Sequence, residues 1–304
     1  MKIFLIVLAS VTGLTVVAEI ALRVTMGWGN PPLYVADPEI GYLLAPNQKL
    51  RRSGNLIETN QYSMRNQQLE AKSANQTRVM LLGDSVVNGS WWTDQSKTLS
   101  SLLANKLQPD IVEVLNASAN SWSPRNQLAY LKRFGLFDAE ALVLIINTDD
   151  LFAIEPTSLV VGKSYSYPNR APGLALIEGY QLLIAPPQSI PELEQLRQAQ
   201  DDRLSQNLAA IKEIRAIAAA TDTKFILVLT PLLREFKSGS QDQEREARMR
   251  LKELTQKEEI NYIDFLTLWA DFPQPEFLYR DHIHPTPQGN TKIIEAIAEQ
   301  LQSI

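Results

Sequence analysis

The run Val79-Met80-Leu81-Leu82 is followed at once by Gly83-Asp84-Ser85, so a short apolar stretch ends in a polar turn. The run is rich in aliphatic residues and has no polar alternation, which is typical of a strand buried on both faces of a parallel sheet. Four later runs have the same character: 111–115, 141–146, 225–229 and 262–265. Amphipathic helical patterns separate the runs. This alternation predicts a doubly wound α/β domain with a five-stranded parallel sheet.

The composition narrows the class of protein. With 304 residues, of which 45% are hydrophobic and 21% charged, the chain is globular and is not a polytopic membrane protein. A net charge of −5 predicts no broad basic surface, so we expect no nucleic-acid partner. The sequence has no cysteine, which excludes a disulfide scaffold and a cysteine nucleophile. His282 and His284 are the only histidines, so imidazole chemistry is expected there.

The first 23 residues have the pattern of a membrane segment. An apolar run from Ile3 to Ala18 follows Lys2, and apolar residues continue past Glu19 to Leu22. This length suits a transmembrane helix, and we favour an uncleaved signal anchor over a secretory signal peptide cut after Ala18. Lys2 favours a cytoplasmic N-terminus. The membrane is then a partner through this helix, and the rest of the chain is extracytoplasmic, in the periplasm or at the cell surface.

The remaining chain divides into two parts. Residues 24–76 contain several prolines but also many apolar residues, which predicts a stem that packs on the main domain. Residues 77–304 form the main domain. Within it, residues 156–195 interrupt the alternation of strand and helix, and such a long connection predicts a lid or a substrate-facing insertion.

Two motifs carry possible chemistry. Gly83-Asp84-Ser85 follows the first strand of the sheet, and ligands of open α/β sheets bind beyond the carboxyl ends of strands. A simple turn is the alternative for this motif. Asp281 and His284 are three residues apart on a tight turn, where the carboxylate can orient the imidazole as a base for a serine. There are two alternatives: His282 and His284 could be capping or surface residues, or Asp281 and both histidines could hold a metal. No further ligand cluster is evident, so no metal or other cofactor is expected.

Together these motifs resemble the first and last conserved blocks of the SGNH (GDSL) hydrolase family. The resemblance rests on Gly83-Asp84-Ser85 with Gly89 four residues on, and on Asp281-x-x-His284-Pro285 before the last helix. It implies a three-layer, flavodoxin-like fold and hydrolysis of acyl esters, often acetyl esters of polysaccharides. It also implies that Ser85 is the nucleophile, His284 the general base and Asp281 the residue that orients it.

The two middle blocks depart from the family pattern. Ser121 stands where the family usually has a glycine whose N–H stabilises the oxyanion. Asp149 stands where the family usually has an asparagine donor, and an ionised carboxylate accepts hydrogen bonds without donating them. Asn147 or Asn120 could replace that donor. Loss of one oxyanion donor typically costs ~10²–10³ in rate.

Two functions are therefore consistent with the sequence. The first is a membrane-anchored extracytoplasmic serine esterase that acts on acyl esters, such as acetyl esters of a glycan or a similar small ester. The second is a catalytically weak or inactive SGNH-like protein that binds glycans or assists polysaccharide assembly. Trp91, Trp92 and Trp122 follow the first two blocks, where they could line a sugar or acyl site or belong to the core.

Overall fold

The computed structural model describes residues 1–302 and contains the predicted parallel sheet at its centre. The sheet strands are β5 (Thr77–Gly83), β6 (Val112–Ser118), β7 (Ala141–Asn147), β8 (Lys224–Thr230) and β9 (Asn261–Asp264). Their order is β6-β5-β7-β8-β9, and every neighbouring pair is parallel. The five predicted apolar runs lie in these strands except at two ends: Ile111 precedes β6, and the last run ends one residue early. Phe265 begins a helix instead of continuing the strand, because the side chain of Asp264 caps that helix by accepting the Leu266 N–H.

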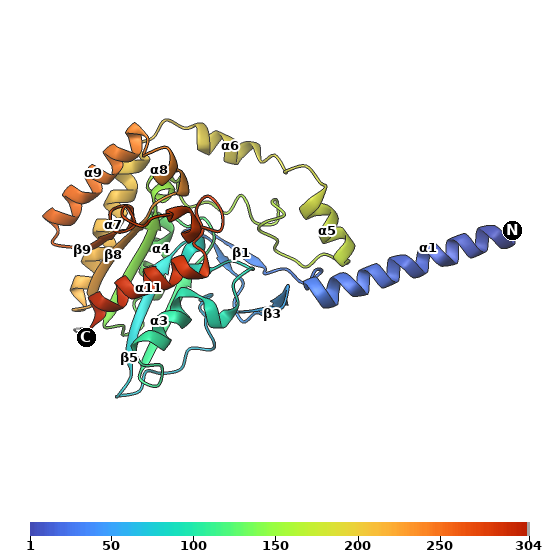
Figure 1. Ribbon diagram of the computed structural model, residues 1–304, viewed down its shortest axis with the longest axis horizontal. Coiled ribbons are helices and arrows are strands. Elements are labelled where there is room, and N and C mark those ends of the chain that lie inside the picture. The colour runs from blue at the N-terminus through green and yellow to red at the C-terminus, as the bar shows by residue number, and fades with distance from the viewer. Residues whose placement is uncertain (303–304) are drawn as a thin grey trace.

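Helices cover both faces of the sheet, so the domain has three layers (Figure 1). One face packs against α4 (Pro124–Phe134), α7 (Arg203–Ala220) and α9 (Asp242–Lys257). The other face packs against α2 (Ser85–Asn88), α3 (Leu99–Leu107), α10 (Phe265–Leu268) and α11 (Pro287–Leu301). A further short helix, α8 (Leu233–Lys237), precedes α9 in the chain. Alternate strand residues face opposite layers, which explains why the runs are apolar throughout.

Residues 24–76 form two antiparallel hairpins that lie on the main domain. Their strands are β1 (Tyr34–Asp37), β2 (Gly41–Leu44), β3 (Lys49–Arg52) and β4 (Asn55–Glu58). Ile40, Tyr42 and Met64 are buried in the same hydrophobic cluster as Leu82 of the central sheet. The Trp122 indole N–H donates to the Tyr42 carbonyl at 2.9 Å. The first hairpin and Met64 therefore share a core with the sheet.

The N-terminal helix α1 (Lys2–Ala21) continues into a short π-helix (Leu22–Met26) and extends away from the rest of the molecule (Figure 1). None of its residues is buried, and the mean hydropathy of its most apolar part is 2.3. Its length and composition allow it to cross a membrane.

The long connection after β7 is mostly irregular. It contains α5 (Ala175–Leu183) and leads to α6 (Pro191–Gln198), which runs back toward α7. Tyr167 packs its ring between Tyr34 and Tyr42, with centroid distances of 5.0 and 5.1 Å. The connection is therefore anchored on the first hairpin.

Candidate active site at the carboxyl ends of β5 and β7

Ser85 lies where the strand order of the sheet reverses, between β5 and β7. This switch point is where open α/β sheets bind ligands. Gly83 is required by close packing, because a Cβ there would lie 2.3 Å from Val87 and 2.8 Å from the Ile145 carbonyl oxygen. Asp84 caps α2 by accepting the Val86 N–H at 2.8 Å. The turn therefore presents the half-buried Ser85 at the first position of a short helix.

Ser85, His284 and Asp281 form a continuous chain of hydrogen bonds. His284 Nε2 lies 2.9 Å from Ser85 Oγ, and His284 Nδ1 lies 2.8 Å from Asp281 Oδ2. Asp281 Oδ1 also accepts the backbone N–H of His284 at 2.8 Å, which fixes the tight turn. The side chain of His282 is 81% exposed, and its Nδ1 lies 3.9 Å from Asp281 Oδ1, beyond hydrogen-bonding distance. The structure thus places His284, and not His282, against the serine.

The electrostatics of this chain keep Asp281 ionised, as a partner for the His284 ring. Burial raises the pKa of Asp281, but hydrogen bonds from the backbone of His284 and Ile283 and from the His284 ring outweigh it and hold the pKa below its ordinary value. An ionised Asp281 accepts from Nδ1–H and leaves Nε2 with its lone pair toward Ser85. Trp92 packs edge-on against the His284 ring, with centroids 4.9 Å apart, and limits its movement.

Asn147 joins the loops after β5 and β7. Its side-chain N–H donates to Asp84 Oδ2 at 2.8 Å, and its Oδ1 accepts the Asp149 N–H at 2.8 Å. Asp150 accepts the Asn147 backbone N–H at 2.9 Å. Burial raises the pKa of both Asp84 and Asp150, and the nearby charge of Asp84 raises that of Asp150 further. Asn147 therefore already has partners that position the two loops.

Ser121 and Asn120 lie on the turn after β6. Ser121 has a φ of +60°, a left-handed conformation that glycine adopts more readily, which agrees with its place in the pattern. Its hydroxyl accepts a hydrogen bond from Tyr167 at 3.0 Å, so the long connection after β7 reaches this turn. Asn120 accepts the Ser90 hydroxyl at 3.2 Å through its side chain and the Tyr42 hydroxyl at 2.6 Å through its carbonyl.

The side chain of Asp149 is 57% exposed, and its nearest cationic partner is Arg234, with Nη2 3.9 Å from Oδ1. Burial raises the pKa of Asp149 above its ordinary value, and the charge of Arg234 opposes that shift. The raised pKa increases the fraction of Asp149 that is protonated. Only the protonated form of this side chain donates a hydrogen bond.

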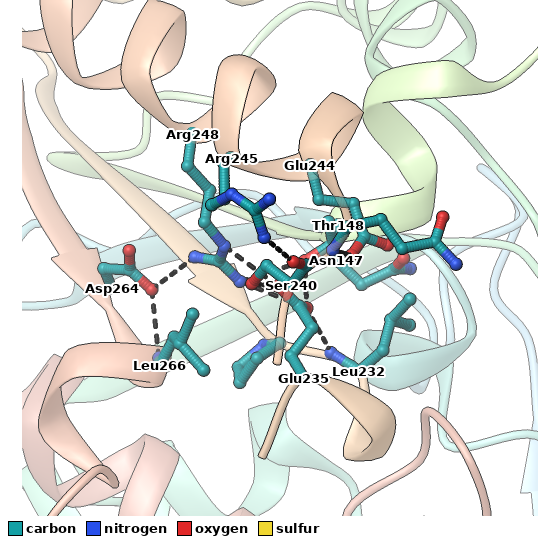
Figure 2. Close-up of polar contacts among 12 residues, drawn as sticks. Asn147, Thr148, Leu232, Glu235, Ser240, Glu244, Arg245, Arg248, Asp264 and Leu266 are labelled. Carbon is teal, nitrogen blue, oxygen red and sulfur yellow. Dashed lines mark hydrogen bonds and ion pairs between the residues drawn. The ribbon is translucent and has the colours of Figure 1, made fainter. Parts of the chain in front are cut away.

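A buried ionic network supports the loop that carries Asp149 (Figure 2). The Thr148 hydroxyl donates to Glu235 Oε2 at 2.7 Å, and Arg248 donates to Thr148 Oγ1 at 3.0 Å. Arg248 also donates to Asp264 Oδ1 at 2.7 Å, which connects the ends of β7 and β9. Burial raises the pKa of Glu235, but hydrogen bonds and charge from Arg248 hold it below its ordinary value. The ionised Glu235 carboxylate therefore holds the loop that carries Asp149 through the hydrogen bond from Thr148.

Several residues of this site have no obvious signal in the sequence. Tyr167, Arg234 and Arg248 reach it from distant parts of the chain, whereas Asp84 belongs to the first motif and Trp92 follows it closely. Across residues 1–302, no group of three or more His, Cys, Asp or Glu side chains has the arrangement of a metal site.

Known proteins share this sequence pattern and this fold. No curated protein matches the chain in sequence. The acetyl xylan esterase AlAXEase is similar in structure, with 12% identity, a TM-score of 0.50 and coverage of 74% of this chain and 99% of that chain. A lipase/acylhydrolase from Enterococcus faecalis has 14% identity, a TM-score of 0.45 and coverage of 75% of this chain and 96% of that chain. The acetylxylan esterase Axe2 from Geobacillus stearothermophilus has 13% identity, a TM-score of 0.48 and coverage of 77% of this chain and 97% of that chain. The family model of the GDSL-like lipase/acylhydrolases matches residues 81–292, which is well over half of the sequence. The chain therefore belongs to the GDSL-like lipase/acylhydrolase family.

Proposed function

We propose that the protein is a serine esterase in which Ser85, His284 and Asp281 form the catalytic triad. The observation that carries this proposal is the chain of hydrogen bonds from Ser85 Oγ through the His284 ring to Asp281, at 2.9 and 2.8 Å. Such a chain allows the imidazole to take the serine proton while the carboxylate stabilises the imidazolium.

The reaction has two stages. In the first, Ser85 Oγ attacks the acyl carbonyl carbon and His284 Nε2 takes the hydroxyl proton. His284 then returns the proton to the leaving alcohol oxygen as the old ester bond breaks, which leaves an acyl-serine ester. In the second stage, water attacks the acyl carbon, His284 takes a proton from the water and returns it to Ser85 Oγ, and a carboxylic acid is released.

Backbone N–H groups are the best candidates for stabilising the oxyanion. Ser85 is the first residue of α2, so its N–H has no acceptor within the helix. The N–H of Ser121 lies on the left-handed turn where the family pattern places a glycine donor. Because Asn147 is tied to Asp84, we assign it to positioning the loops.

We propose that the substrate is an acyl ester, such as an acetyl ester of a glycan or a similar small ester. AlAXEase, which shares the fold, is named an acetyl xylan esterase. We also propose that α1 anchors the protein in a membrane with the main domain on the extracytoplasmic side. The exposed apolar helix supports the anchor, and Lys2 ahead of it supports the orientation.

Labelling of the full chain in detergent with a fluorophosphonate probe tests the activated serine. We expect label on the wild type and none on Ser85→Ala, with turnover of a small acetyl ester following the same pattern. Equal labelling of both would place the reactive group elsewhere. Protease accessibility on intact cells tests the location, and a mature protein that begins at Glu19 in the soluble extracytoplasmic fraction would contradict the anchor.

One observation favours a second function, a catalytically weak or inactive module that binds glycans or assists polysaccharide assembly. Asp149 occupies the usual donor position and lies next to Arg234. An ionised carboxylate there opposes the developing negative charge. Absence of label on a folded wild-type protein would support this alternative.

A further inference from the structure

The exposed surface of α5 is apolar. Leu183 and Ile184 are 73% and 72% exposed, and the other members of the patch are Leu174, Ile177, Tyr180 and Leu182. The stretch from Ala171 to Pro191 contains a single charged residue, Glu178, which is buried. Soluble surfaces carry single apolar side chains, whereas a contiguous group of this kind marks an interaction surface.

This patch lies at the foot of the N-terminal helix. Figure 1 shows one end of α5 beside the end of α1 where α1 leaves the domain, with α5 running away from that point. The Glu19 carboxylate of α1 accepts the N–H groups of Ala175 and Leu176, at 2.8 and 3.0 Å, and so satisfies the first turn of α5. Arg23 pairs with Glu19 at 2.6 Å and donates to the Gly173 carbonyl at 2.9 Å. The first turn of α5 is therefore level with the end of the apolar span.

The opposite face of α5 is locked to the hairpin region. Glu178 is buried, pairs with Arg52 and accepts the Gly29 N–H. Trp28 fills the space over Gly179, where a Cβ would lie 2.5 Å from the indole ring. Loss of one partner from a buried ion pair is strongly destabilising, so this arrangement holds the orientation of α5 firmly. The apolar face of α5 is thus kept outward.

We propose that α5 is an interfacial helix that lies in the surface of the bilayer spanned by α1. The apolar face would enter the boundary between headgroups and acyl chains, as amphipathic surface helices do. Arg23 and Trp28 would then lie at headgroup level, where such residues are enriched. The face carries no basic residue, so its binding depends on apolar burial and is insensitive to salt. The proposal rests on the anchor proposed for α1.

With this contact, both α1 and α5 would hold the domain at the membrane. Tyr167 belongs to the same long connection as α5 and donates to Ser121 beside the candidate active site. The membrane contact of α5 therefore restricts rotation of the domain about α1 and sets the height of the site above the lipid surface.

Site-specific labelling tests the proposal, because the chain has no cysteine and each introduced thiol is unique. The variants are Leu183→Cys on α5, Val11→Cys in the middle of α1 and Met249→Cys on α9; all three native side chains are exposed. Each full-length variant is labelled with an environment-sensitive fluorophore and reconstituted in phosphatidylcholine nanodiscs that contain nitroxide lipids. A circular-dichroism spectrum that matches the wild type verifies that each variant is folded.

We expect the label at Leu183 to lose fluorescence most with nitroxides near the headgroup, and the label at Val11 with nitroxides at the ends of the acyl chains. The label at Met249 should lose none, and added salt should change nothing. Quenching at Val11 without quenching at Leu183 would overturn the proposal and leave the anchor intact. A blue-shifted but unquenched label at Leu183 would assign the patch to a second copy of the chain and overturn it too. No quenching at either position would overturn both proposals.

Discussion

Replacement of Asp149 by asparagine tests how the proposed active site would stabilise an oxyanion. The family pattern places an asparagine donor at this position, whereas the structure has a carboxylate that is 57% exposed and 3.9 Å from Arg234. Asparagine keeps the shape, removes the charge and supplies an N–H₂ donor. We expect Asp149→Asn to raise kcat on a simple acetyl ester.

Two contributions set the size of this gain. A carboxylate about 4 Å from an oxyanion in a well-hydrated site repels it by ~1 kcal/mol. The exposure of Asp149 makes this hydrated value the relevant one, and it corresponds to ~5-fold in rate. A fully preorganised donor is worth about 2.7–4 kcal/mol, of which a half-exposed side chain realises a part. The sum predicts an increase of ~10-fold or more for Asp149→Asn. Asp149→Ala removes only the charge and should gain ~5-fold at most.

The assay compares initial rates of wild type, Asp149→Asn and Asp149→Ala across the pH range. The pKa of Asp149 is raised by burial, and only the protonated form donates. Wild-type activity should therefore fall as pH rises through the Asp149 pKa, whereas Asp149→Asn should show no such fall, because its amide does not ionise. An unchanged or lower kcat in Asp149→Asn, or an alkaline optimum in the wild type, would refute the reasoning and leave the oxyanion to backbone N–H groups.

Three further predictions concern the same site. Ser85→Ala and His284→Ala should each lower turnover of a small acetyl ester by ~10⁴ or more, while His282→Ala keeps most of it; greater damage from His282→Ala would contradict the assigned base. Arg248→Met leaves Glu235 buried without its cation and should lower the free energy of unfolding by about 3–5 kcal/mol. Urea titration measures this loss, and an unchanged stability would contradict the prediction. Ser121→Gly keeps the N–H at a positive φ, so turnover should stay close to wild type, and a large loss would show that the serine hydroxyl is needed.

The sequence by itself was sufficient to predict the architecture and to identify the two terminal motifs. The apolar runs that became β5 to β9 are local signals, because a strand buried on both faces needs aliphatic residues at successive positions. Asp281 and His284 are three residues apart, so the tight turn alone brings the carboxylate to the imidazole. Ser85 is 199 residues away from His284 in the sequence. The parallel sheet explains how they come together, because the carboxyl ends of its strands meet at one edge.

Only the tertiary structure decided the partners of the polar side chains. Nothing near Asn147 in sequence indicates that its amide is bound by Asp84, and nothing near Glu19 indicates that its carboxylate holds the first turn of α5. Arg248 supports the loop after β7 from a helix 100 residues further along the chain. Burial of an apolar residue depends on local periodicity, whereas a buried charge is stable only with a specific partner at hydrogen-bonding distance. That partner is determined by the packing of distant elements, which no short stretch of sequence encodes.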